Sequence, residues 1–182
     1  MLCCGGAVGG FFYLKNQVFN FSSDPVEVAK VSRGIAEIDM PPGFKPVMSM
    51  KFNIAGTGMT MAAYAADNNE GGLFLMEVSG QNAGADPEVL RAQMEAQMKA
   101  QQGGHGSRQI KDLETRPPVE VEIRGKPATF KIQKGTDAQS NKEFTQVMGT
   151  FEGKEGTDML FMQLPSDKYS DEQVEKIIRS IK

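Results

Sequence analysis

Methionine is the residue type in this sequence whose abundance could carry chemistry. The 182 residues include 12 methionines, and Met48 with Met50 and Met59 with Met61 have Met-x-Met spacing. Thioether sulfurs are soft ligands that suit Cu(I). In a strand, however, residues i and i+2 share a face, so adaptable core packing explains the same spacing. Supporting ligands are few, because His105 is the only histidine and lies in a glycine-rich stretch. Copper binding is therefore an alternative interpretation.

Catalytic motifs are not recognisable in the sequence. Cys3 and Cys4 are the only cysteines, so the body of the chain has no thiolate nucleophile, and neither G-x-S-x-G nor H-E-x-x-H occurs. Residues 103 to 106 resemble a phosphate loop but follow a predicted helix, where a phosphate loop precedes one. Helix capping explains the acidic pairs at predicted helix starts, which are Asp86 with Glu88 and Asp171 with Glu172. We therefore assign no catalytic, cofactor-binding or metal-binding residue and expect no cofactor. A hydrolase that uses carboxylates remains a second alternative.

The charge pattern excludes a basic nucleic-acid-binding surface. The formal net charge is −3, and positive and negative residues are interspersed. A nucleic-acid partner would require a basic face that neutralises phosphates.

The body is also long enough to bury a core without a metal or disulfide. The cysteines do not indicate whether this body lies in a reducing or an oxidising compartment.

The first 14 residues, M-L-C-C-G-G-A-V-G-G-F-F-Y-L, carry no charged side chain. As a helix they would be about 21 Å long, short of the roughly 30 Å hydrocarbon core. A basic n-region and an A-x-A cleavage site are missing, so a signal peptide fits poorly. We interpret the segment as the C-terminal part of a membrane-spanning helix, with Met1 a misassigned start and Phe11, Phe12 and Tyr13 at the interface. An apolar leader, or a segment packed on its own domain, is the alternative.

The body begins with a predicted helix and continues into strands. Asp24 as N-cap, Pro25 at N1 and Glu27 at N3 predict the helix start, and Gly34 marks the helix end. An alternating strand is predicted at residues 48–54, and the next strand at 59–66. Continuous apolar strands are predicted at 73–78 and 159–164. A second helix is predicted from 86 to about 102. Residues 119–123 and 128–132 form a predicted hairpin joined by Arg124-Gly125-Lys126-Pro127.

The residue pattern of the C-terminal region predicts a central strand followed by a last helix that packs on the sheet. Val174, Ile177, Ile178 and Ile181 form one apolar helical face, and Ser170 with Gln173 forms a capping box. Residues 73–79 and 159–165 match as parts of a weak strand-strand-helix repeat. The fold class predicted from these patterns is α+β. It consists of a single antiparallel sheet with flanking helices, in two strand-strand-helix units, preceded by an N-terminal helix.

This layout resembles the PsbP-like α/β domains, in which an antiparallel sheet ends in a last helix with an I-x-x-S-I-type signature. The matching residues here are Ile178-Arg179-Ser180-Ile181, after the strand that ends at Leu164. The chain is also similar to membrane-anchored bacterial proteins of unknown function, through residues 36–44 and a later apolar strand that ends in Pro165. These resemblances imply a fold and an accessory role. They carry over no catalytic residue.

The sequence therefore predicts residues 1–15 as the end of a membrane anchor, 16–23 as a linker and 24–182 as one α+β domain. The expected function is that of a non-enzymatic bacterial accessory domain that binds a protein or small ligand. Its expected partners are the membrane, through the N-terminal segment, and that ligand, with no nucleic acid. The expected location is the extracytoplasmic side of the membrane.

Overall fold

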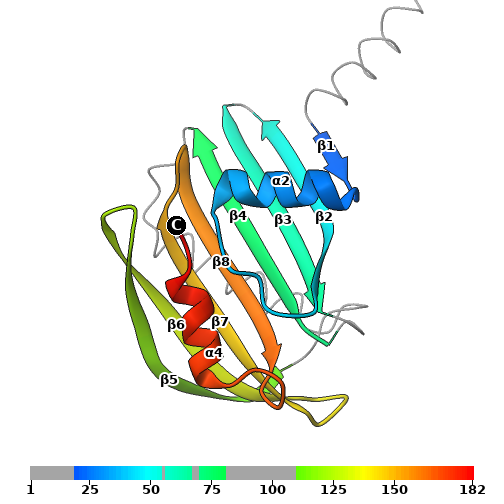
Figure 1. The fold of residues 1–182 in the computed structure, drawn as a ribbon, viewed down its shortest axis with the longest axis vertical. Coiled ribbons are helices and arrows are strands. Elements are labelled where there is room, and N and C mark those ends of the chain that lie inside the picture. Colours follow the sequence, from blue (N-terminus) through cyan, green and yellow to red (C-terminus); the bar gives the residue numbers. More distant parts are fainter. Residues whose placement is uncertain (1–18, 55, 67–69, 81–109) are drawn as a thin grey trace, which may run out of the picture.

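A computed structural model describes residues 19–54, 56–66, 70–80 and 110–182. In these ranges the chain forms one eight-stranded antiparallel sheet, with the strand order β1-β2-β3-β4-β8-β7-β6-β5 (Figure 1). The strands are β1 (Phe19–Ser22), β2 (Phe44–Ile54), β3 (Thr57–Ala66), β4 (Gly72–Gly80), β5 (Ile110–Ile123), β6 (Lys126–Asp137), β7 (Glu143–Glu152) and β8 (Gly156–Pro165).

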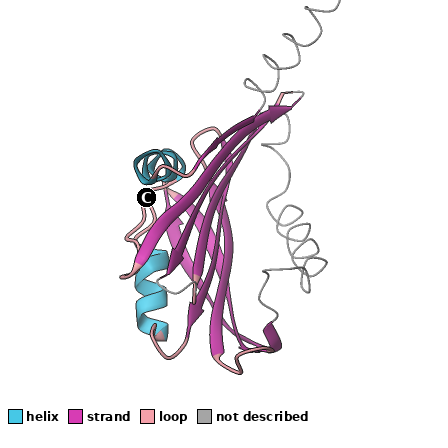
Figure 2. Ribbon diagram, turned by 90° about the vertical axis from the view of Figure 1, so that its right-hand side faces the viewer, coloured by secondary structure: helices cyan, strands magenta, loops and turns pink. Residues whose placement is uncertain are grey.

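Two helices, α2 (Pro25–Ile35) and α4 (Asp171–Arg179), lie on the same face of the sheet (Figure 2). Helix α2 crosses the half of the sheet that contains β2, β3 and β4, and α4 lies over the other half (Figure 1). The predicted start signals are both present. The Asp24 carboxylate accepts from the Val26 backbone N–H, and Ser170 with Gln173 forms a reciprocal capping box. Local sequence therefore determines where each helix begins.

The main core lies between the helices and the sheet. Its sheet side is lined by buried residues of the central strands, among them Leu75 of β4 and Leu160 of β8. These two residues are cross-strand partners, and Phe74 pairs with Phe161. The prediction that the two continuous apolar strands are neighbours in one antiparallel sheet is thus confirmed. Leu160, Phe161, Met162, Ile177 and Ile181 were all expected to be buried, and all are less than 9% exposed.

The predicted fold class is wrong. The described chain is mainly β-structure, with eight strands and only two short helices of 11 and 9 residues. The element at its start is strand β1, where the sequence analysis placed a linker, and α2 follows β1. Four residues are too few to show a periodicity, so β1 depends on pairing with β2.

The hairpin of β5 and β6 is also much longer than the sequence patterns indicated. The strands have 14 and 12 residues. The register shifts between Lys111 and Glu114 and again between Arg116 and Val119. The second irregularity contains Pro117 and Pro118. An edge strand tolerates proline, because the N–H groups on its outer side need no partner. The predicted turn is present, since Arg124 and Gly125 connect the strands with φ values of 52° and 77°.

The predicted helix at 86–102, the first of the two helices in the repeat, lies outside the described residues, as do His105 and residues 1–14. Within the described residues, no helix is both long and apolar enough to cross a bilayer.

Gly149 of β7 leaves space for a buried aromatic ring. A Cβ atom at Gly149 would lie 2.2 Å from the ring of Phe130, which is the cross-strand partner of Gly149 and is fully buried. The Phe130 ring therefore occupies the space above the glycine, and Phe151 packs against that ring with centroids 6.2 Å apart.

We expect Gly149→Ala to lower the free energy of unfolding by roughly 1–3 kcal/mol, because the buried ring has to move. Gly34→Ala is the matched control. A Cβ there meets no atom within 4 Å, so the better helix former should leave stability unchanged or raise it by up to about 1 kcal/mol. Urea denaturation measures both values, and equal effects of the two substitutions would contradict this packing.

Candidate functional site

One row of the sheet, on the face that carries the helices, is polar across five strands. Asn20 of β1 pairs with Lys51, Lys51 with Thr60, Thr60 with Glu77, and Glu77 with Asp158 of β8. Residues two apart on a strand share a face, so the adjacent row on this face begins at Ser22. That row is Ser22, Ser49, Ala62, Leu75 and Leu160, and it becomes part of the apolar core from Ala62 onward.

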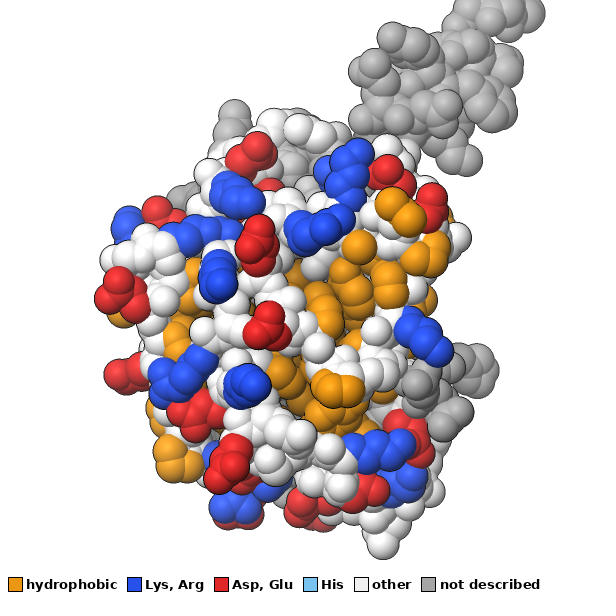
Figure 3. Space-filling view, viewed as in Figure 1, with side chains coloured by type: hydrophobic (Ala, Val, Ile, Leu, Met, Phe, Trp, Pro, Cys, Tyr) orange, Lys and Arg blue, Asp and Glu red, His pale blue; other side chains and the backbone are white. Residues whose placement is uncertain are grey.

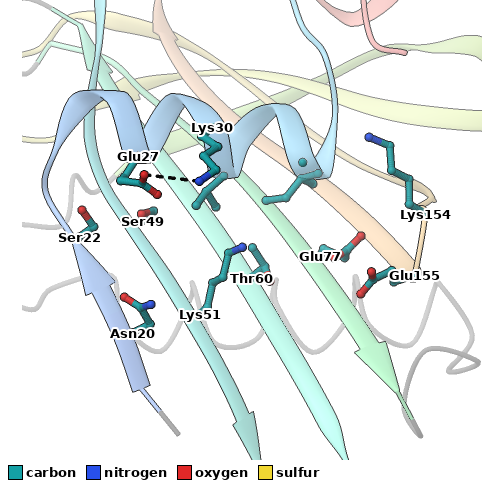
Figure 4. A pocket seen from close by; sticks show the side chains of 13 residues that line it. Asn20, Ser22, Glu27, Lys30, Ser49, Lys51, Thr60, Glu77, Lys154 and Glu155 are labelled. Carbon is teal, nitrogen blue, oxygen red and sulfur yellow. Dashed lines mark ion pairs between the residues drawn. The ribbon is translucent and has the colours of Figure 1, made fainter. Parts of the chain in front are cut away.

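The part of this row from Asn20 to Glu77 lies beside α2 and forms the floor of a pocket with a volume of about 290 Å³. Helix α2 provides one wall, and the turn between β7 and β8 provides Lys154 and Glu155 (Figure 4). We call this cavity the α2 pocket. It is lined by Asn20, Ser22, Glu27, Lys30, Val31, Gly34, Ile35, Ser49, Lys51, Thr60, Glu77, Lys154 and Glu155. Its size suits a small molecule.

The charges in the α2 pocket are only partly paired. Lys30 lies 3.6 Å from Glu27 one turn along α2, and both side chains are well exposed. No carboxylate of the described residues forms an ion pair with Lys51, whose side chain lies over the floor close to Thr60 (Figure 4). Glu77 and Glu155 lie close together at the other end of the floor (Figure 4). The pocket therefore has the Lys51 ammonium group on its floor and, separately, the neighbouring carboxylates of Glu77 and Glu155, with the Lys154 ammonium group on the same turn as Glu155.

Glu77 is the most constrained of the charged residues in the pocket. It is only 8% exposed. Burial raises its pKa, the negative charge of Glu155 raises it further, and a hydrogen bond from the Glu155 backbone opposes the shift. A cationic group that bound between the two carboxylates would lower the pKa of Glu77 and stabilise its charged form.

Behind Glu77, Asp158 forms a buried ion pair with Arg124. An Arg124 Nη1 hydrogen donates to Asp158 Oδ2 at 2.9 Å, and the Asp158 side chain is fully buried. Asp158 Oδ1 has no hydrogen-bond partner among the described residues. Burial outweighs the attraction to Arg124 and, with repulsion from Glu77, raises the pKa of Asp158 to about 7. Two neighbouring carboxyl groups, Glu77 and Asp158, are therefore both hard to ionise.

Arg124 also holds three backbone segments around this carboxyl group. It donates to the carbonyl oxygens of Ile35 at 2.7 Å, Glu152 at 2.8 Å and Lys182 at 3.3 Å. These carbonyls belong to the end of α2, the end of β7 and the C-terminus. Arg124 thereby fixes the end of α2, which forms part of the pocket wall.

Most methionines of the described strands lie on the face of the sheet opposite the helices. Met50, Met61, Met76 and Met159 are successive cross-strand partners, so four thioethers occupy one row from β2 to β8. The other members of the two Met-x-Met pairs fall in adjacent rows, with Met48 opposite Ala63 and Met59 opposite Phe52. No group of three or more His, Cys, Asp or Glu side chains in the described part of the chain could hold a metal ion.

The residues of the α2 pocket were not identifiable from the sequence. Lys51 and Thr60 appear in the sequence as ordinary polar positions of alternating strands. Glu77 carried a signal, because it interrupts an apolar strand, but only the strand register shows that it meets Asp158. The acidic residues interpreted as caps are placed as expected where the structure describes them, since Asp171 and Glu172 occupy the first turn of α4. Asp86 and Glu88 lie outside the described residues.

No protein-family profile matches the chain, and no curated protein sequence matches it. Among solved structures, the chain is similar to the cyanobacterial PsbP (CyanoP) from Synechocystis sp. PCC 6803. The TM-score is 0.43 and the identity 12%, over 91% of this chain and 92% of that chain. It is also similar to LpqN, which is involved in cell envelope biogenesis of Mycobacterium tuberculosis, with a TM-score of 0.34 and 10% identity over 91% and 87% of the two chains. The weak resemblance to PsbP-like domains inferred from the sequence is thus also found in structure. Similarity of this size assigns neither a family nor a function.

Because folding raises the pKa of Asp158, this residue favours the folded state more at low pH than at high pH. Its pKa in the unfolded chain is near 3.9, and in the folded chain it is about 7. The contribution is therefore fully present below about pH 4 and is lost as the pH rises through 7. Above pH 7 the buried carboxylate is ionised and depends on Arg124 for compensation.

We expect Arg124→Met to lower the free energy of unfolding by roughly 3–5 kcal/mol at pH 8, because it leaves a buried charge unpaired. At pH 5 the loss should be smaller, since Asp158 is then protonated. The control is the same substitution in an Asp158→Asn background, where the cost should be smaller and independent of pH. Chemical denaturation at the two pH values measures all four proteins. An equal cost at both pH values in the wild-type background would contradict the assignment.

Proposed function

We propose that this protein is a non-enzymatic accessory domain of a bacterial membrane that binds a small polar molecule in the α2 pocket. The N-terminal segment would tether the domain to the membrane, with the domain on the extracytoplasmic side. The observation that carries the binding role is the open polar row from Asn20 to Glu77. It places on the floor of one cavity the Lys51 ammonium group, which has no ion-pair partner among the described residues, and the Glu77 carboxylate, and Glu155 lines the same cavity.

The charge distribution favours a zwitterionic ligand. The Lys51 ammonium can bind a carboxylate, and the pair Glu77 and Glu155 can bind an ammonium group. Thr60 lies between Lys51 and Glu77 in the polar row, and Ser49 and Asn20 also line the cavity. Free amino acids and short peptides carry these opposite charges on a body that fits about 290 Å³.

The support for the tether comes from the sequence of residues 1–14. Their uncharged, glycine- and aromatic-rich composition is typical of a segment in or near lipid. The described chain begins with β1 at the edge of the sheet, so the preceding residues connect to the domain at this edge (Figure 1).

A carboxylate-dependent hydrolase is the second candidate, and Glu77 is the observation that favours it. Burial and the neighbouring Glu155 carboxylate raise the pKa of Glu77, which favours the protonated form that a general acid needs. Binding still explains the pocket better, because Asp158 is tied to Arg124 and does not line the cavity.

A nuclear magnetic resonance titration tests the binding role. Glycine, lysine, glutamate and alanyl-alanine would be added to the isotope-labelled full chain in detergent micelles. We expect shifts confined to residues around the α2 pocket, and Lys51→Met should weaken the binding at least tenfold by removing a charge-assisted hydrogen bond.

Lys111→Met, which changes an exposed lysine of edge strand β5, is the matched control and should bind as the wild type does. Absence of shifts with every probe, or an unchanged affinity in Lys51→Met, would contradict the proposal. Cleavage of the dipeptide in the same sample, abolished by Glu77→Gln, would instead establish the hydrolase.

Copper binding remains a distinct alternative because of the row of four methionines. Titration of Cu(I) with a competing chelator, such as bathocuproine disulfonate, tests it directly. If the row is core packing, the wild type and the double variant Met61→Leu/Met76→Leu should leave the same fraction of Cu(I) with the chelator. Retention of Cu(I) by the wild type that the double variant loses would establish a thioether site.

A further inference from the structure

Strand β1 has two faces of opposite character. Phe19 and Phe21 are 51% and 62% exposed and lie on the face of the sheet opposite the helices. Asn20 and Ser22 point to the other face and line the α2 pocket (Figure 4). Two neighbouring aromatic rings this exposed on an edge strand suggest contact with an apolar or amphipathic partner.

The two rings continue an uncharged surface of the sheet. The Phe19 ring stacks on Phe52 of β2 with centroids 5.4 Å apart and an interplanar angle of 15°. Phe21 is the cross-strand partner of Met50. From β1 to β4 the two rows are Phe19, Phe52, Met59, Val78 and Phe21, Met50, Met61, Met76, and neither contains a charged residue. We call Phe19, Phe21 and Phe52 the aromatic corner.

The aromatic corner lies close in sequence to the apolar N-terminal segment. The segment ends at Leu14, and β1 begins five residues later at Phe19. Five extended residues span at most about 17 Å. If the segment ends at a bilayer surface, the aromatic corner is therefore held within that distance of the surface.

We propose that the aromatic corner rests on the lipid bilayer, with Phe19 and Phe21 at the boundary between headgroups and acyl chains. This inference depends on the tether in the proposed function. Phenylalanine is typical of apolar surfaces that lie at this boundary, and the β1–β2 pairing fixes the backbone that carries both rings. The contact orients the domain, because the α2 pocket opens on the opposite side of β1, away from the lipid.

The absence of tryptophan from the sequence permits a direct test. Phe21→Trp makes the only indole in the full chain, which is then reconstituted into phosphatidylcholine vesicles with and without brominated acyl chains. We expect a blue-shifted emission and quenching by the brominated lipid at least twice that of a control. The matched control is Val26→Trp, because Val26 is 71% exposed, lies five residues further along and belongs to α2 on the opposite side of the sheet.

Vesicle flotation of both proteins shows whether a negative result concerns the tether or the lipid contact of the aromatic corner. If the chain floats with the vesicles but Phe21→Trp is not quenched beyond Val26→Trp, the tether holds and the aromatic corner does not touch lipid. A blue shift without quenching would indicate that a second copy or another protein covers the corner, and would overturn the proposal. If the chain does not float with the vesicles, both the tether and the lipid contact are contradicted. Thermal unfolding confirms that the variants fold, and Phe19→Trp serves if Phe21→Trp does not.

Discussion

The ion pair between Arg124 and Asp158 is the interaction on which the arrangement around the α2 pocket depends. Burying a carboxylate is unfavourable unless it is paired, and Arg124 lies 2.9 Å from Asp158. The same guanidinium binds the carbonyl of Ile35, one of the groups that a helix C-terminus leaves without an internal partner. It also binds the C-terminal carbonyl of Lys182. A turn residue on the β5–β6 hairpin thus connects both halves of the sheet through one side chain.

The sheet uses its faces for different purposes. On one face α2 and α4 bury the central strands, and the apolar rows end abruptly at the polar row of the α2 pocket. Charged residues of both signs are interspersed over the rest of this face, and neither sign dominates in the view shown (Figure 3). The other face is rich in methionine and phenylalanine and ends at the aromatic corner. An antiparallel sheet permits this division because successive side chains alternate between faces.

Local signals in the sequence predicted several elements correctly, and long-range features could not be predicted. The capping box at Ser170, the turn at Arg124-Gly125 and the pairing of the two continuous apolar strands each depend on residues that are close together or strongly apolar. The fold class was wrong because β1 is only four residues long and bulges extend β5 past two prolines. The polar floor residues Asn20, Lys51, Thr60 and Glu77 come from four different strands, so no spacing in the sequence connects them. Only the register places Lys51 beside Thr60 and Thr60 beside Glu77.

The register of β1 connects the two proposed surfaces. A shift of one residue would reverse every side chain of this strand, which would move Asn20 out of the pocket and Phe21 into it. Within the described strands, β1 is an edge strand whose four residue pairs are all with β2, so few backbone interactions fix its position. The stacking of Phe19 on Phe52 favours the observed register, because the shifted strand would lose this aromatic pair. An aromatic contact on one face of the strand therefore helps to hold the polar wall of the α2 pocket on the other.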